Sequence, residues 1–274
     1  MSEEQDTSPV RKLPSALDCL DHIVAADNRK PAVFLDYDGT LTPIVPHPDD
    51  AILSDAMRAS LRRLANLCVV AIVSGRDLRD VRQRVGIEGI WYAGSHGFDI
   101  AGPHEQHQEY QEGPEYLPVL DAAERALREQ LASVPGCLVE RKRFSIATHY
   151  RQVAQDAIAT VTKAVDNVHA GYPRLRQKGG KKIIELLPDV DWDKGKALRW
   201  LMQVLDLNPM RIMPVYIGDD VTDEDAFREL ASDGAGILVA AEDGPTRASY
   251  RLDDPDQVQR FLDQLSDKLQ TSRS

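Results

Sequence analysis

The segment AVFLDYDGT at residues 32–40 decides the fold of this chain. Four apolar residues lead into two aspartates, which is typical of a buried parallel strand that ends at a functional edge. The same form recurs in CVVAIVSGR at 68–76, IMPVYIGDD at 212–220 and GAGILVAAEDG at 234–244. Helical periodicity lies between and after these runs, as in Ala197, Leu198, Leu201, Met202 and Leu205. Strands that alternate with helices predict an α/β fold, with a Rossmann-like, mostly parallel sheet and helices on both faces.

Three of these strands end in polar clusters: DYDGT at 36–40, SGRD at 74–77 and GDD at 218–220. Asp, Gly and Ser are also ordinary turn residues, so one such cluster alone would say little. In open α/β sheets, however, ligands bind outside the carboxyl ends of the strands. Three clusters therefore favour a binding or catalytic site at this edge.

The middle of the chain has a different pattern. Residues 102–117 are polar, helical periodicity follows at 120–131, and 137–151 shows the partial alternation of a hairpin. A second helical face begins at Val153, and 181–188 has the composition of a strand. We expect an inserted α+β cap domain. The expected division is an N-terminal tail and short helix at 1–30, a core at 31–110 and 187–274, and a cap at 111–186.

Composition narrows the class of protein. The formal net charge is −11 over 274 residues, which argues against a nucleic-acid surface. An acidic protein that binds an anion needs a local cation or basic cluster. No window reaches the roughly 18 apolar residues of a membrane helix, and the polar N-terminus resembles no signal sequence. We expect a cytoplasmic monomer without a membrane partner. Three widely spaced cysteines give neither a disulfide framework nor a zinc site.

Asp36 and Asp38 are the first candidates for chemistry. Carboxylates at i and i+2 on a strand point the same way, because strand side chains alternate. They could hold a hard cation together, or one could act as nucleophile and the other as general acid/base. Gly39 lets the chain turn sharply and lets backbone N–H groups approach an anion.

The later motifs supply further candidates. In GDDVTDED at 218–225, Asp219 is the first choice as a metal ligand. Asp220 and Asp223 fit ligands, supporting groups or helix caps equally well, because acids at a helix start also serve as caps. Ser74, followed by Gly75, suits a hydrogen bond to a phosphate oxygen. Lys194 opens a helix, where an anion would favour it, although its spacing alone also fits a solvated surface lysine.

The motifs DYDGTL, SGR, DKG and GDDVTDED, in this order, resemble those of the haloacid dehalogenase superfamily of phosphatases. Within it, the chain is similar to trehalose-6-phosphate phosphatases, whose cap lies between the second and third motifs. The passages GSHG at 94–97, VERKRFSIATHYR at 139–151 and GKKIIELLP at 180–188 carry that similarity.

The resemblance implies Mg²⁺-dependent hydrolysis of trehalose 6-phosphate, the last step of trehalose biosynthesis, through an aspartyl-phosphate. Asp36 would be the nucleophile and Asp38 the acid/base. The metal would be held by Asp36, the Asp38 carbonyl and Asp219, with Asp220 as a further candidate. The phosphoryl group would be bound by Ser74, Gly75 and Lys194. The sugar would be bound by Ser95 and His96 of the core, and by Glu140, Lys142, His149, Arg151, Lys181 and Glu185 of the cap.

Two alternatives stay open. A related enzyme could act on another sugar phosphate, such as sucrose 6-phosphate, because only the cap passages distinguish the substrates. A phosphosugar sensor could keep Asp36 and the metal without catalysis, although a mere phosphoacceptor does not need Asp38.

Overall fold

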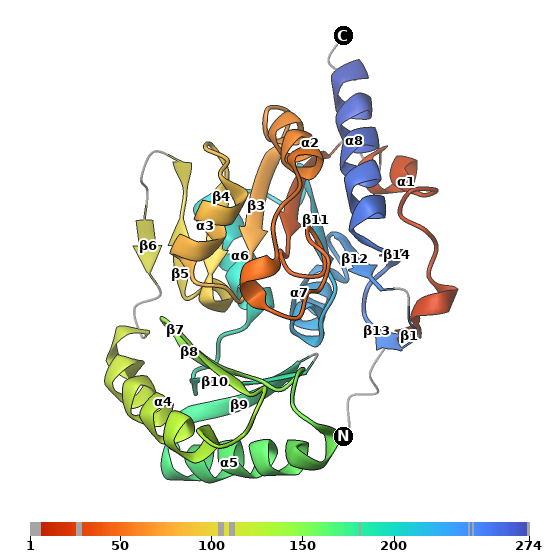
Figure 1. Cartoon of the computed structure of the whole chain (residues 1–274). Coiled ribbons are helices and arrows are strands. Elements are labelled where there is room, and N and C mark those ends of the chain that lie inside the picture. The colour runs from red at the N-terminus through yellow and green to blue at the C-terminus, as the bar shows by residue number, and fades with distance from the viewer. Residues whose placement is uncertain are drawn as a thin grey trace, which may run out of the picture. The chain divides into compact units, whose positions relative to one another are not determined.

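The computed structural model describes residues 7–25, 29–103, 107–109, 113–180, 182–240, 242 and 244–272. The chain divides into two compact units. Unit 1 comprises Met1–His107 and Asp193–Ser274, and unit 2 comprises Gln108–Trp192. Figure 1 labels the elements of both. The range 111–186, expected for the cap, lies inside unit 2.

The larger sheet has eight strands in the order β14-β12-β11-β2-β3-β4-β5-β6. The strands from β14 to β5 belong to unit 1, and β6 begins at the last residue of this part of unit 1, His107. The pairs from β14 to β4 are parallel, and β5 is antiparallel to β4. The strands are β2 Lys30–Leu35, β3 Val69–Val73, β4 Trp91–Gly94, β5 Asp99–Ala101, β6 His107–Glu109, β11 Ile212–Gly218, β12 Ala235–Val239 and β14 Tyr250–Leu252.

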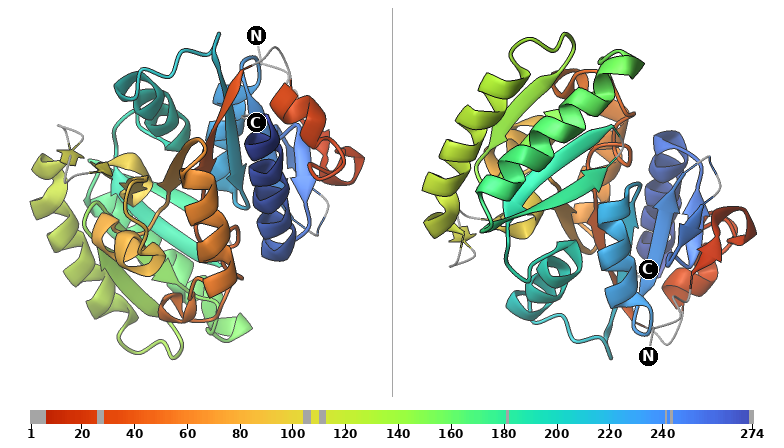
Figure 2. Two further views of the ribbon diagram at one scale, coloured as in Figure 1. Left: turned by 90° about the horizontal axis from the view of Figure 1, so that it is seen from above. Right: turned by 90° about the horizontal axis from the view of Figure 1, so that it is seen from below.

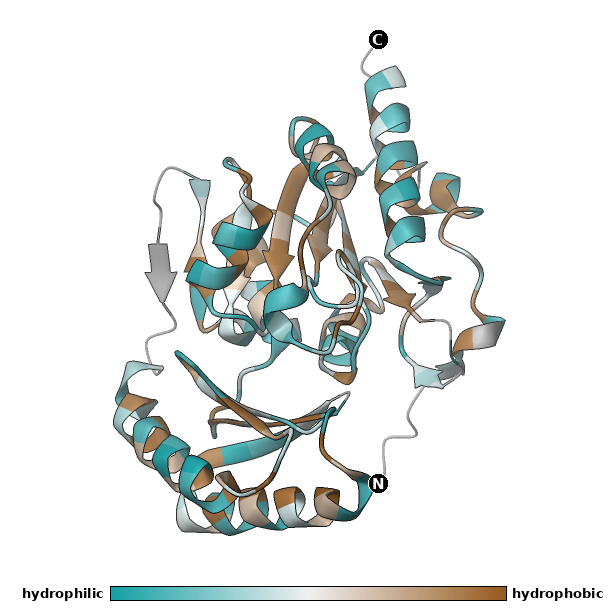
Figure 3. Cartoon of the chain, viewed as in Figure 1, coloured by the Kyte–Doolittle hydropathy of each residue, from teal (hydrophilic) through white to brown (hydrophobic). Residues whose placement is uncertain are grey.

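Helices cover both faces of this sheet, because its central strands are apolar on both sides. On β2, Val33 and Leu35 belong to one core cluster, whereas Ala32 and Phe34 belong to the other. The first cluster includes residues of α1 Leu20–Ala25, α2 Asp55–Ala65, α3 Leu78–Val85 and α8 Pro255–Thr271. The second includes residues of α6 Lys194–Val204 and α7 Glu224–Leu230. Figure 3 shows apolar strands between helices with mixed faces. The predicted fold class is confirmed.

The N-terminal segment packs on unit 1. β1 Ser8–Pro9 pairs with β13 Pro245–Thr246, and the 3-10 turn Val10–Lys12 follows. Helix α1 lies beside α8, as the views in Figures 1 and 2 agree. Ile23 of α1 is fully buried.

Unit 2 has an antiparallel sheet of order β7-β8-β10-β9. Its strands are β7 Leu138–Lys142, β8 Ser145–His149, β9 Leu175–Gly180 and β10 Ile183–Pro188. Val139, Ile146, Ile184 and Leu186 pack with α4 Leu117–Leu131 and α5 Ile158–Gly171 in one core. The predicted hairpin at 137–151 is therefore β7 and β8. Further short 3-10 turns in both units lie at Pro48–Asp50, Ser95–Gly97, Pro114–Tyr116, Gln155–Ala157 and Val221–Asp223.

The structure bears on membrane-spanning helices and on the cysteines. In the part of the chain that it describes, no helix combines the length and apolar character needed to span a bilayer. Cys19, Cys68 and Cys137 are free thiols and partly buried.

We expect Leu198→Ala to lower the free energy of unfolding by about 2–5 kcal/mol, because Leu198 is fully buried in the core between α6 and the sheet. Val204→Ala is the matched control, since Val204 ends the same helix and is 37% exposed. Urea unfolding measures both. Equal losses would contradict the assigned packing of α6.

Candidate active site

The parallel pairing of β2 and β11 brings two acidic motifs together. Leu35 lies opposite Ile217, and the Asp36 N–H donates to the Ile217 carbonyl at 2.9 Å. Asp36 and Asp219 follow these strands directly and are both buried. The sheet edge expected from the sequence therefore carries the first and last motifs side by side.

A buried charge cluster forms at this edge. Carboxylate oxygens of Asp36, Asp219 and Asp223 lie within 4.8 Å of one another. Lys194 Nζ donates to Asp36 Oδ1 at 2.9 Å and to Asp223 Oδ1 at 2.7 Å. The Lys194 side chain is 3% exposed, so it is not the solvated surface lysine that its spacing also allowed.

Asp223 joins the parts of this cluster. Its Oδ1 also accepts from the Tyr216 hydroxyl at 2.7 Å. Its Oδ2 accepts from the backbone N–H groups of Asp219 at 3.0 Å and Asp220 at 2.9 Å. Four donors therefore surround one fully buried carboxylate. The sequence left Asp223 undecided between cap and function; in the structure it caps the turn and also holds Lys194.

Asp220 has a different environment. Its Oδ1 accepts from the Val221 N–H at 2.8 Å, and it begins the turn Val221–Asp223 as a capping residue. Among the described residues, the cluster of three carboxylates contains neither Asp220 nor Asp38. Their part in metal binding stays a prediction.

The pKa values in the cluster reflect burial and charge. Burial raises the pKa of Asp36 well above its usual range; Lys194 lowers it, while Asp223, Asp219 and Asp38 raise it further. Burial also raises the pKa of Asp223, but Lys194 and the hydrogen bonds from the Asp220 N–H and the Tyr216 hydroxyl lower it, and the net shift is downward. Burial lowers the pKa of Lys194, yet Asp223 and Asp36 raise it well above normal. The lysine thus stays cationic, and it is shared between two acids.

Asp38 points elsewhere than the sequence suggested. Strand β2 ends at Leu35, before both aspartates, so strand alternation does not orient them. Asp38 binds Arg76 instead, with Nε to Oδ2 at 2.6 Å and Nη2 to Oδ1 at 2.7 Å. Arg76 received no role from the sequence, although it stands in the SGRD motif.

The SGR segment and the GSHG loop interlock. The Ser74 N–H donates to the Ala93 carbonyl at 2.8 Å, and the His96 N–H donates to the Ser74 carbonyl at 2.9 Å. Ser95 Oγ donates to Asp77 Oδ1 at 3.0 Å. A Cβ on Gly75 would lie 2.8 Å from His96 Cε1, so the imidazole packs on this glycine. The predicted residues Ser74, Gly75, Ser95 and His96 are thus one local structure.

This loop has an unusual backbone. Ser95 has φ 49° and His96 has φ 57°, and Gly97 follows at φ 92°. Left-handed conformations cost free energy in residues that have a Cβ, and they cluster at functional sites. No sequence pattern indicated this strain.

Four of the six predicted residues of unit 2, Glu140, Lys142, His149 and Glu185, lie on one face of its sheet. The register places Glu140 opposite Ala147, and Ala147 opposite Glu185, so these side chains share the face away from α4 and α5. Lys142 Nζ donates to Glu185 Oε1 at 2.7 Å. His149 Nε2 lies 2.8 Å from Glu140 Oε2. Arg151 is exposed just after β8. Lys181 lies outside the described residues.

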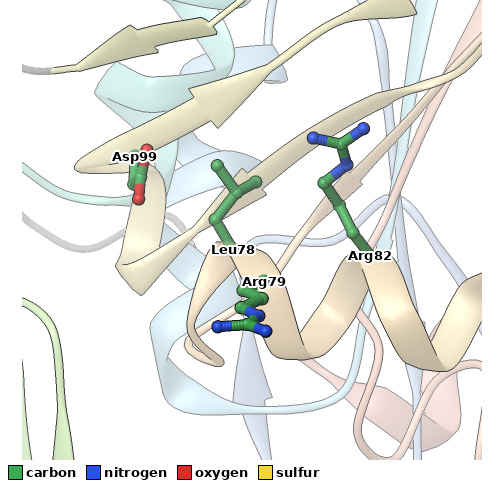
Figure 4. A pocket seen from close by; sticks show the side chains of 4 residues that line it. All are labelled: Leu78, Arg79, Arg82 and Asp99. Atoms are coloured by element: carbon green, nitrogen blue, oxygen red, sulfur yellow. The ribbon is translucent and has the colours of Figure 1, made fainter. Parts of the chain in front are cut away.

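A hollow of about 410 Å³ lies on unit 1 beside the start of α3. Figure 4 shows its lining residues Leu78, Arg79, Arg82 and Asp99. None of these residues was predicted to belong to the site.

Gly39 sets the separation of the two acidic motifs. It has φ 82°, and a Cβ there would lie 2.2 Å from Asp219 Oδ2. Gly89 has φ 84°, and a Cβ there would meet nothing within 4 Å, so it carries the same backbone preference without the overlap.

We therefore expect Gly89→Ala to cost about 1–2 kcal/mol of unfolding free energy from backbone strain alone. Gly39→Ala should cost about 1–3 kcal/mol more, from overlap with Asp219. Urea unfolding of both variants measures the difference. Equal losses would show that Asp219 yields freely and does not constrain this turn.

Comparisons with known proteins agree with this geometry. A family model described as trehalose-phosphatase matches residues 34–256. A trehalose-phosphate phosphatase of Mycobacterium marinum is 45% identical over 264 residues, which cover 95% of this chain and 67% of that protein. The Mycobacterium tuberculosis H37Rv protein of the same name is 45% identical over 265 residues, with 94% and 67% covered.

A solved structure shows the same fold. The C-terminal domain of trehalose-6-phosphate phosphatase from C. albicans matches with a TM-score of 0.82 and 22% identity, over 93% of this chain and 99% of that one. The family match extends over most of the chain and includes all four motifs. The chain belongs to the trehalose-phosphatase family.

Proposed function

We propose that this chain hydrolyses trehalose 6-phosphate to trehalose and phosphate through a phosphorylated Asp36. The observation that carries the proposal is the buried pair of Asp36 and Lys194 at the sheet edge, 2.9 Å apart, in a chain that belongs to this family. A carboxylate fixed beside an ammonium group is well placed to attack phosphorus while the ammonium group binds a phosphoryl oxygen.

The reaction has two steps. In the first, an Asp36 oxygen bonds to phosphorus as the bond from phosphorus to the sugar oxygen breaks. The sugar oxygen takes a proton from Asp38. In the second, water bonds to phosphorus, Asp38 takes its proton, and the bond to Asp36 breaks. Splitting hydrolysis in this way replaces one difficult step with two easier ones.

Ser74, Gly75 and Lys194 would hold the phosphoryl oxygens. Ser74 is 1% exposed beside Gly75, and its backbone is fixed by Ala93 and His96. Charge spreads over these oxygens during phosphoryl transfer, so fixed donors stabilise the transition state.

The carboxylate cluster fits a divalent cation, which we propose to be Mg²⁺. Carboxylate and carbonyl oxygens are the ligands that such hard cations prefer. Two of the three buried carboxylates, Asp36 and Asp223, share one lysine, and repulsion among the three contributes to the raised pKa of Asp36. Asp36, Asp219 and the Asp38 carbonyl would hold the ion, with Asp220 as a further candidate. The positive charge of the ion would favour the ionised form of Asp36 and would neutralise the phosphoryl oxygens. Asp223, surrounded by four donors, would anchor Lys194 instead.

We propose unit 2 as the cap domain that recognises the sugar. The polar face of its sheet carries Glu140, Lys142, His149 and Glu185, and Arg151 and Lys181 complete the proposed set. Carboxylates accept and ammonium groups donate hydrogen bonds, so this face suits the hydroxyl groups of a disaccharide. Ser95 and His96 would supply contacts from unit 1. The small-molecule substrate is the only partner proposed, and we propose a cytoplasmic monomer.

We expect phosphate release from trehalose 6-phosphate to exceed release from sucrose 6-phosphate and glucose 6-phosphate, and Asp36→Asn to abolish it. Amide nitrogen and oxygen replace the nucleophilic carboxylate with little change of shape, and loss of a covalent nucleophile costs several orders of magnitude in rate. Malachite-green detection in Mg²⁺ buffer measures release.

Two outcomes would change the assignment. Faster turnover of sucrose 6-phosphate would retain the chemistry and reject the substrate. Tight binding of the phosphosugar without turnover would favour a sensor.

We expect Mg²⁺ at 100-fold above its Kd to stabilise the protein by roughly 2.7 kcal/mol, because it would bind the folded acidic cluster. Differential scanning fluorimetry with Mg²⁺ and after EDTA measures the change in Tm. Asp219→Asn should lose most of the shift, and Asp225→Asn, on the first turn of α7, should keep it. An identical shift in both variants would argue against the assigned site.

A further inference from the structure

We propose that Arg76 is the positioning residue for Asp38, and this inference rests on the proposed function. Two nitrogens on one edge of the guanidinium, Nε and Nη2, donate to the two oxygens of the Asp38 carboxylate, at 2.6 and 2.7 Å. Such a two-point contact fixes the plane of a carboxylate, which a single hydrogen bond does not. Arg76 therefore sets the direction of the group that would exchange protons with the sugar oxygen and with water.

Arg76 is itself held from several sides. Its Nη1 donates to Asp80 Oδ2 at 2.9 Å, and its Nη2 also donates to the Pro48 carbonyl at 2.7 Å. Its guanidinium lies over the Tyr37 ring, 5.3 Å from the centroid, and Tyr37 donates to the Ala51 carbonyl at 2.9 Å. The Arg76 side chain is 8% exposed, whereas that of Asp38 is 44% exposed. The arginine is thus the buried and fixed partner of a more exposed aspartate.

The backbone of Arg76 ties this partner to the proposed phosphoryl site. Its N–H donates to Ser74 Oγ at 3.1 Å, and its carbonyl accepts from the Ser95 N–H at 2.6 Å. One residue therefore fixes Asp38 relative to Ser74. A positioned acid depends on such fixing, because a displacement of about 1 Å can cost roughly 100-fold in rate.

The contact leaves room for chemistry. The guanidinium occupies one edge of the Asp38 carboxylate, and the exposure of that side chain leaves the other edge open to a sugar oxygen or water. As the bond from phosphorus to the sugar oxygen breaks and the bond to Asp36 forms, the proton passes from this open edge to the sugar oxygen. Arg76 remains protonated throughout and touches no reacting atom.

The test compares substrates that differ in their need for a proton. Arg76→Lys keeps the positive charge but loses the two-point contact. We expect kcat/KM for trehalose 6-phosphate to fall by about 10–100-fold, part of the contribution of a positioned acid. For p-nitrophenyl phosphate, whose leaving group departs without a proton, kcat/KM should fall by less than about 3-fold. Equal losses on both substrates would indicate a merely structural role and overturn the proposal.

Arg84→Lys is the matched control. Arg84 binds Asp80, as Arg76 does, and binds Asp49 rather than Asp38. Its replacement should leave kcat/KM for both substrates close to wild type. A loss specific to trehalose 6-phosphate in Arg84→Lys would show that the whole network, rather than the Arg76 contact, is responsible.

A double-mutant cycle gives a second measurement on the sugar phosphate alone. If Arg76 acts through Asp38, Arg76→Lys should change kcat/KM by less than about 2-fold in an Asp38→Ala background. If the loss of kcat/KM in the double variant equals the product of the losses in the two single variants, the proposal is overturned. Wild-type protein that fails to hydrolyse trehalose 6-phosphate would instead reject the proposed function, so the two failures are distinguishable.

Discussion

The buried ammonium group of Lys194 is the constraint on which the sheet edge depends. A buried charge is costly unless it is paired, and removing one partner of such a pair destabilises a protein strongly. Lys194 has two partners, Asp36 after β2 and Asp223 in the turn before α7. The start of α6 must therefore lie against both elements. The neighbours of Lys194 serve the same end, since Asp193 caps the helix through the Lys196 N–H, and a Cβ on Gly195 would lie 2.4 Å from the Asp225 carbonyl.

The sequence was sufficient to predict an element where one physical rule alone determines that element. Uninterrupted apolar runs predicted β2, β3 and β11, because parallel strands buried on both faces have that composition. Parallel pairing then brought Asp36 and Asp219 to one edge. Strand β9 escaped prediction, since Leu175–Gly180 is polar and glycine-rich, and its strand conformation depends on pairing with β10. The conformation of an edge strand depends on backbone hydrogen bonds with its neighbouring strand, and the residues of the edge strand do not reveal that neighbour.

Side-chain partners were harder to predict, for a related reason. The acids that pair with Lys194 lie 158 and 29 residues away in the sequence. The position of Lys194 in its motif alone therefore could not exclude a solvated surface lysine. Asp38 was expected to point with Asp36, but β2 ends at Leu35 and Arg76 takes the Asp38 carboxylate. Tyr216 stands inside an apolar run, and only the fold shows that its hydroxyl reaches Asp223. Each of these contacts joins elements that the sequence pattern treats separately.

The charges of the site bear on how an acidic chain could bind an anion. Lys194 was expected to supply positive charge to the phosphoryl group, but Asp36 and Asp223 already share it. Arg76 is likewise shared between Asp38 and Asp80. These two cations therefore leave little positive charge unbalanced at the sheet edge. Asp219 adds a further carboxylate to this edge, so the acids named here outnumber the two cations. The divalent cation that we propose among these carboxylates would offset the excess and bring positive charge directly to the oxygens of a phosphate dianion.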